Sequence, residues 1–150
     1  MRWKKMKAVL QRVKSASVTI NNKLYSSISA GMLVLFCVEK DDTDEMLDWF
    51  ANKISVLRCF EDEVGKMNLS LKDVNGEVLV VSQFTLAADC KKGTRPSFDS
   101  AEKPDIARQK YEAFVVKLKN LGFVVKTGVF GAMMDISLVN DGPVTFVLER

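Results

Sequence analysis

Alternating apolar and polar residues near the start of the chain predict two consecutive β-strands. The first covers residues 7–14, where Ala8, Leu10 and Arg12 share one face, since successive side chains of a strand point to opposite sides. The second covers residues 16–20 and leads into a polar turn at residues 21–23. We interpret residues 1–5, which precede this pattern, as a dispensable tail.

Two continuous apolar runs predict buried central strands: residues 32–38 (MLVLFCV) and 78–81 (VLVV). The charged residues 39–41 after the first run are interpreted as its solvated end, and the Asn75-Gly76 pair before the second is typical of a hairpin. The sequence also predicts a loop over residues 65–69. Further strands are predicted over residues 58–60, 123–127, 134–139 and 144–148.

Two stretches have the spacing of amphipathic helices. In the first, Asp42 is followed three residues later by Glu45, a capping-box pattern. The second begins at Pro104 and ends at Gly122, a residue suited to a left-handed helix cap. We interpret both apolar stripes as core. Their members are Met46, Leu47, Phe50, Ile54 and Leu57 in the first, and Ile106, Tyr111, Phe114, Val115, Leu118 and Leu121 in the second.

These elements predict an α+β fold: a curved, mostly antiparallel sheet or partly open β-barrel, with two helices packed on one side. Repeats, low-complexity tracts and linkers are absent from the sequence, so we expect one domain over residues 1–150. No apolar run is long enough to span a bilayer, and the basic start lacks the features of a signal peptide.

Composition narrows the chemistry mainly through the absence of histidine. Without it, Ser-His-Asp and Cys-His catalysis and the usual zinc sites are excluded, so we expect no metal and no cofactor. The three cysteines, Cys37, Cys59 and Cys90, are widely spaced and odd in number, which indicates reduced thiols in a cytoplasmic protein. A net charge of +3 permits an RNA or phosphate partner without requiring one.

Polar side chains follow directly at the end of the second buried strand. Ser82, Gln83 and Thr85 flank Phe84 there, and a short loop with Lys91, Lys92 and Arg95 comes next. A rigid strand that ends in hydroxyl and amide groups beside basic residues suits an active site. The alternative is that Ser82 and Thr85 only satisfy backbone groups where the strand ends.

The segment Asn140-Asp141-Gly142-Pro143 lies between two predicted strands. Its composition favours a turn, and spacing alone favours a tight hairpin. A Gly-Pro bond also tolerates the cis form, which orients the neighbouring carbonyls differently from a trans bond.

Together, Ser82–Leu86 (SQFTL) and Asn140–Thr145 (NDGPVT) resemble the two signature motifs of D-aminoacyl-tRNA deacylases. Matching flanks extend the resemblance over nearly the whole chain from Met6. They include residues 8–13 (AVLQRV), 60–68 (FEDEVGKMN), 92–98 (KGTRPSF) and 127–134 (TGVFGAMM). Met133 departs from the family, many members of which carry a polar residue there.

The resemblance implies a homodimeric editing hydrolase that cleaves the ester between a D-amino acid and the terminal ribose of tRNA. The Gly142-Pro143 tip of one subunit would enter the site of the other and act as a chiral filter. Its carbonyls would hold the α-ammonium group and leave no room for an L side chain, while achiral glycine would pass. Aminoacyl-tRNA is then the partner, and no membrane or DNA partner is expected.

The same resemblance suggests roles for single residues. Ser82 and Gln83 would position the ester and ribose, and backbone N–H groups at Phe84 and Thr85 would stabilise the oxyanion. The ribose 2′-hydroxyl would activate the water, and we favour a positioning role for the Thr85 hydroxyl over a nucleophilic one. The remaining assignments are Phe84 against the substrate, Phe130 and Met134 beside the terminal adenosine, Lys91, Lys92 and Arg95 at acceptor-stem phosphates, and Arg12 as support of the Gly-Pro loop.

Two other functional classes stay open at this point. One is a catalytically silent RNA-binding or oligomeric scaffold that keeps the motifs as dimer contacts. The other is a small-molecule esterase or amidase that uses Thr85 as nucleophile. Deacylation of defined D- and L-aminoacyl-tRNAs distinguishes all three.

Overall fold

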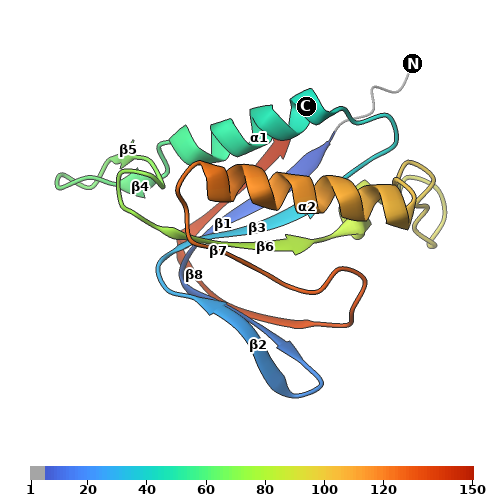
Figure 1. Cartoon of the computed structure of the whole chain (residues 1–150), viewed down its shortest axis with the longest axis horizontal. Helices are drawn as coiled ribbons and strands as arrows, with labels where there is room; N and C mark the ends of the chain where they lie inside the picture. The colour runs from blue at the N-terminus through green and yellow to red at the C-terminus, as the bar shows by residue number, and fades with distance from the viewer. Residues whose placement is uncertain (1–5) are drawn as a thin grey trace.

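The curved β-sheet of this chain is covered on one side by two helices (Figure 1). The computed structural model describes residues 6–150. The elements in chain order are β1 (Lys7–Ile20), β2 (Lys23–Ile28), β3 (Gly31–Cys37), α1 (Asp44–Val56), β4 (Phe60–Glu61), β5 (Met67–Leu69), β6 (Glu77–Ser82), the 3₁₀ turn η1 (Phe84–Ala87), α2 (Pro104–Asn120), β7 (Val125–Thr127) and β8 (Asp135–Glu149).

The main sheet has the strand order β2-β1-β3-β6-β7, and β8 pairs with the other edge of β1. The ladders of β1 with β2, β3 and β8 are antiparallel, whereas β3–β6 and β6–β7 are parallel. The two outer strands of this path, β2 and β7, lie close to each other. The Ser26 hydroxyl on β2 donates to the Thr127 carbonyl oxygen on β7 at 2.7 Å. The sheet is therefore nearly closed, and the predicted α+β class is confirmed.

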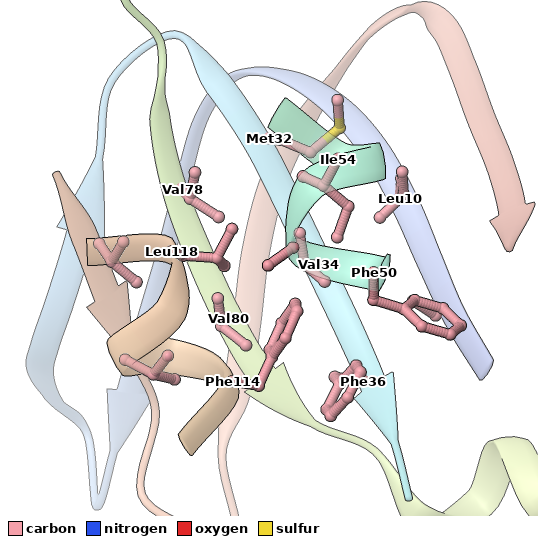
Figure 2. Close-up of a cluster of buried hydrophobic side chains, with 14 of the residues drawn as sticks. Leu10, Met32, Val34, Phe36, Phe50, Ile54, Val78, Val80, Phe114 and Leu118 are labelled. Carbon is pink, nitrogen blue, oxygen red and sulfur yellow. The ribbon is translucent and has the colours of Figure 1, made fainter. Parts of the chain in front are cut away.

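Side chains from both faces of the central strands are buried. Toward the helices, Phe36 of β3 stacks on Phe114 of α2, with ring centroids 4.1 Å apart, and Phe50 of α1 meets Phe36 edge-on (Figure 2). On the opposite face, Leu33 and Leu79 belong to a second cluster inside the curl of the sheet. This double burial explains why the β3 and β6 sequences are apolar without alternation, and it confirms the core role of most of the two helical stripes.

The predicted pair of N-terminal strands is a single strand. β1 pairs with β3 over residues 7–13 and then with β2 over residues 16–20, with an irregularity after Val13. The hairpin prediction for Asn140-Asp141-Gly142-Pro143 is also wrong. Asn140 pairs with Val13 and Thr145 pairs with Gln11, so the residues between them bulge out of one continuous strand, β8.

Several boundaries differ from expectation for local reasons. Helix α1 begins at Asp44 after the N-cap Thr43, without a side-chain cap, because the Asp42 carboxylate instead accepts from the Glu39 N–H at 2.7 Å. Residues 67–69 form β5, which pairs with β4 and is not a loop.

The Asn75 turn has the expected positive φ of 53°, but it does not close a hairpin. It leads into β6, whose neighbouring strands β3 and β7 both run parallel to it. In α2, Ile106 and the C-cap Leu121 are 36% and 37% exposed, because both lie at the helix ends.

Candidate active site

The polar end of β6 forms a sharp bend whose backbone hydrogen bonds are well defined. The Gln83 N–H donates to the Phe36 carbonyl oxygen at 2.8 Å and ends the β3–β6 ladder. The η1 turn then begins, and its first hydrogen bond runs from the Leu86 N–H to the Gln83 carbonyl oxygen at 3.3 Å. The N–H groups of Phe84 and Thr85 precede that bond, so they have no acceptor within the turn. The Gln83 side-chain amide donates to the Thr85 hydroxyl oxygen.

Two adjoining depressions lie on either side of this bend. One, of about 320 Å³, is bounded by the β6 end and the residues before β8, including Gln83 and Met134. The other, of about 250 Å³, is more apolar and lies toward the start of α2, with Ala101 and Pro104 in its wall. Both share Ser82, Phe84, Phe130 and Gly131. The structure therefore brings together Ser82, Gln83, Phe84, Phe130 and Met134, which the sequence singled out.

The wall opposite β6 is the segment between β7 and β8. Phe130 lies beside Tyr111 of α2, with centroids 5.9 Å apart, and the Tyr111 hydroxyl donates to the Val80 carbonyl oxygen at 2.7 Å. The Met134 sulfur lies so close to Gly128 that a Cβ there would be 2.5 Å from it. Met133 also lines this depression but is 91% exposed, so its side chain contributes little to the packing of the wall.

The basic loop after η1 is closed at its base by two backbone hydrogen bonds between Asp89 and Ser97, of 2.7 and 2.9 Å. Phe98 follows this base and meets the ring of Phe84 edge-on at 5.2 Å. Lys91, Lys92 and Arg95 are exposed on the loop and line neither depression. Their charges therefore lie beside the site and outside its pocket.

The Gly142-Pro143 bulge is supported by a buried arginine from the neighbouring strand. The peptide bond between Gly142 and Pro143 is cis, and Gly142 has a φ of 127° that favours glycine. Arg12 donates through Nε to the Asp141 carbonyl oxygen at 3.1 Å and through Nη1 to the Cys59 carbonyl oxygen at 2.9 Å. Its Nε also lies 3.5 Å from Asp141 Oδ2. The guanidinium group thus joins the bulge to the segment after α1.

The two motifs lie at opposite ends of the sheet within one chain. Ser82 pairs with Phe36 near the end of β3, whereas Arg12 pairs with Met32 near its start. Four residues of strand separate these positions by about 13 Å along the strand alone. Gly142 and Pro143 accordingly line neither depression. A single chain does not bring its bulge to its own β6 end.

A buried polar cluster behind the bend was not anticipated. The interpretation of residues 39–41 as a solvated strand end is wrong for Glu39, which is only 4% exposed. Burial, with a smaller contribution from Glu39, raises the pKa of the neighbouring Asp42 to about 6. Burial likewise raises the pKa of the Cys37 thiol to about 12, so this thiol keeps its proton at neutral pH. The only sequence signal was that Glu39 directly continues an apolar run.

A cluster of metal-binding side chains and a membrane-spanning helix are both absent from residues 6–150. Within residues 6–150, no three His, Cys, Asp or Glu side chains converge on a metal-binding geometry. None of the helices in that part of the chain combines the length and apolarity that a membrane crossing requires.

Comparisons with known proteins agree on one family. The sequence model of the family described as D-Tyr-tRNA(Tyr) deacylase matches residues 9–149. The chain is 56% identical over 145 residues to a D-aminoacyl-tRNA deacylase of Exiguobacterium sibiricum, an alignment that covers 97% of this chain and 100% of that one. It is also 56% identical over 144 residues to one of Thermotoga petrophila, covering 96% and 97% of the two chains.

Two solved structures have the same fold. One, described as a c-Myc DNA Unwinding Element Binding Protein, superposes with a TM-score of 0.92 at 42% identity, over 97% of this chain and 99% of that one. The other, described as a probable eukaryotic D-amino acid tRNA deacylase, has a TM-score of 0.85 at 18% identity, over 97% and 100%. The second similarity concerns the fold alone.

Proposed function

Because the chain belongs to the D-Tyr-tRNA(Tyr) deacylase family, we propose that it hydrolyses the ester of D-aminoacyl-tRNA and releases free tRNA and the D-amino acid. The match over residues 9–149 supports a single deacylase domain, to which residues 1–5, outside the described part, are dispensable. We place its action in the cytoplasm, where aminoacyl-tRNA is made and used. The scaffold and small-molecule esterase alternatives have no comparable support.

The chemistry we propose needs little acid–base power from the protein, since an aminoacyl ester is already activated. The ribose 2′-hydroxyl next to a 3′-linked ester activates the attacking water. The N–H groups of Phe84 and Thr85, which have no acceptor within the η1 turn, donate to the carbonyl oxygen as negative charge develops on it. In other hydrolases, loss of one such donor costs about 100- to 1,000-fold in kcat. The Thr85 hydroxyl, which accepts from the Gln83 amide, positions the ester.

The nucleotide end of the substrate fits the apolar depression of about 250 Å³. Phe130, shared by both depressions, offers an aromatic face for the terminal adenine, with Met134 on the adjoining wall. The ester then lies at Ser82 and Gln83, where the two depressions meet. Lys91, Lys92 and Arg95, exposed beside the site, contact phosphates of the acceptor end.

Chiral selection, in this proposal, requires a second copy of the chain. The single observation that carries it is the separation of the two motifs: the Gly142-Pro143 bulge lies at the far end of β3 from Ser82. In a homodimer the partner's bulge enters the site, and its carbonyl groups accept hydrogen bonds from the α-ammonium of the substrate. An L side chain collides with this bulge, whereas a D side chain or the hydrogen of glycine does not. Arg12 holds the bulge in place.

The test is deacylation of D-Tyr-tRNA, L-Tyr-tRNA and Gly-tRNA by the purified protein. We expect cleavage of the D-tyrosyl and glycyl esters and survival of the L-tyrosyl ester. Comparable cleavage of the L ester would refute the filter, and survival of all three would refute the proposed function. Duplex DNA added in excess should leave the rate unchanged, whereas uncharged tRNA should compete.

A further inference from the structure

The carbonyl side of the η1 turn is held by groups from four parts of the chain. The Cys37 sulfur on β3 lies 3.7 Å from the Phe84 carbonyl oxygen. Lys7 Nζ on β1 donates to the Leu86 carbonyl oxygen at 3.4 Å. The Ser100 hydroxyl lies 3.1 Å from the Ala87 carbonyl oxygen, and the Ala88 N–H donates to the Thr85 carbonyl oxygen at 3.1 Å. Every carbonyl of the turn therefore has a donor within reach, and Ser100 shares its one hydroxyl proton between the Ala87 carbonyl oxygen and Glu39 Oε1.

Glu39 connects two of these donors. Its Oε1 lies 2.9 Å from the Ser100 hydroxyl and 3.9 Å from Lys7 Nζ. The backbone around it fixes the same contact, since the Lys40 N–H donates to the Ser100 carbonyl oxygen at 3.0 Å and Glu39 forms a β-bridge with Ala101. A carboxylate buried to this extent needs hydrogen bonds and a positive partner to offset its desolvation, and Ser100 and Lys7 supply both.

Because the peptide group is planar, the contacts of the carbonyl groups also determine where the Phe84 and Thr85 N–H groups point. In a trans peptide the C=O and the following N–H point in opposite directions. The Phe84 carbonyl, turned toward the buried Cys37 thiol, therefore directs the Thr85 N–H away from the core. The Gln83 carbonyl accepts from the Leu86 N–H inside the turn, so the Phe84 N–H points in the opposite direction, away from Leu86. The raised pKa of Cys37 keeps the thiol in its donor form.

We propose that Glu39, acting through Ser100 and Lys7, is a positioning residue that fixes the η1 turn so that the Phe84 and Thr85 N–H groups face the substrate ester. The inference rests on the proposed hydrolysis and adds a group that touches neither substrate nor reacting atoms. It predicts that the cluster affects kcat and leaves KM unchanged, because the N–H groups gain most of their interaction in the transition state.

Ser100 provides a matched pair of variants. Ser100→Thr keeps the hydroxyl, whereas Ser100→Val has the same shape as threonine without it. Relative to the threonine variant, we expect Ser100→Val to lose about 3- to 10-fold in kcat for D-Tyr-tRNA, the worth of one hydrogen bond, with the same KM. Glu39→Gln keeps the volume and removes the charge, and we expect a decrease in kcat of at least this size, again with unchanged KM.

Amide hydrogen exchange of Leu86 and Ala88 supplies a readout that needs no substrate, because their N–H groups form the hydrogen bonds of the turn. We expect faster exchange of these two amides in Ser100→Val than in Ser100→Thr. Equal exchange and equal kcat in the pair would overturn the positioning role, and so would a loss confined to KM. Wild-type protein that fails to cleave D-Tyr-tRNA would overturn the proposed function, while the exchange difference would still decide whether the cluster fixes the turn.

Discussion

Asp42 is a buried carboxylate, and we expect that removal of its charge raises stability at neutral pH. Its Oδ2 accepts from the Glu39 N–H at 2.7 Å, but within residues 6–150 its Oδ1 has no hydrogen-bond partner. Burial is the main cause that raises its pKa from 3.8 to about 6; the hydrogen bond from the Glu39 N–H and the charge of Lys110 oppose the shift, and the charges of Glu39 and Glu102 add to it. We therefore predict that Asp42→Asn stabilises the protein at pH 7.5.

The magnitude follows from the difference between the folded and unfolded pKa. A shift of about two pH units corresponds to about 3 kcal/mol, of which about 1–2 kcal/mol should remain after the new amide N–H₂ is accommodated. For a chain of this size that is about 2–8 °C in Tm. The folded state keeps the Asp42 proton to a higher pH than the unfolded chain, so wild type loses stability as pH rises from about 4 to about 6. The advantage of Asp42→Asn should therefore vanish below pH 4.

The assay is chemical denaturation of both proteins at pH 7.5, 5.5 and 4.0. Glu63→Gln, which removes a charge of the same sign from an exposed position, serves as the control and should change stability by less than about 0.5 kcal/mol at each pH. A variant that is less stable than wild type at pH 7.5, or a gain that is the same at all three pH values, would refute the argument.

The remaining predictions concern the proposed reaction. Light scattering should give twice the 16.8 kDa chain mass, and mixing a Ser82 mutant with a Gly142 mutant should restore activity; a fully active monomer would contradict the shared site. Thr85→Ala should lose only about 5- to 30-fold in rate, whereas a 2′-deoxy terminal adenosine should nearly abolish cleavage; equal rates for deoxy and ribose substrates would rule out substrate assistance. Arg12→Met should lower the free energy of unfolding by about 1.5–3 kcal/mol and weaken D/L discrimination; unchanged selectivity would separate Arg12 from the filter.

Local signals in the sequence were sufficient for much of the fold. The spacing of Leu47, Phe50 and Ile54 predicted a buried helix face, and Gly122 marked the end of α2, where its φ is 97°. The apolar runs at β3 and β6 predicted strands covered on both faces. In each case neighbours within a few residues determine the structure, so a short window of sequence contains the information.

The errors concern features that depend on distant partners. β1 continues without a break from its pairing with β3 to its pairing with β2, and the Asn140–Pro143 segment is a bulge within β8. Both strands stay continuous because they pair with each other along most of their lengths. Turn-forming residues alone do not reveal whether the chain reverses there. The burial of Glu39 was missed for the same reason. Its partners Lys7 and Ser100 lie 32 residues before it and 61 residues after it in the sequence.

The β1–β8 ladder also determines when the bulge can exist during synthesis. Lys7 of β1 pairs with Glu149 of β8, so β1 cannot complete this ladder until β8 has been synthesised. The β1–β3 ladder and helix α1 use only residues up to Val56, so their residues are available long before β8 is made. Arg12 then holds the Cys59 carbonyl before Asp141 arrives. A nascent chain that stalls before β8 therefore has the residues of its β6 bend but lacks the bulge, and under the proposed mechanism it would have no chiral filter to offer a partner.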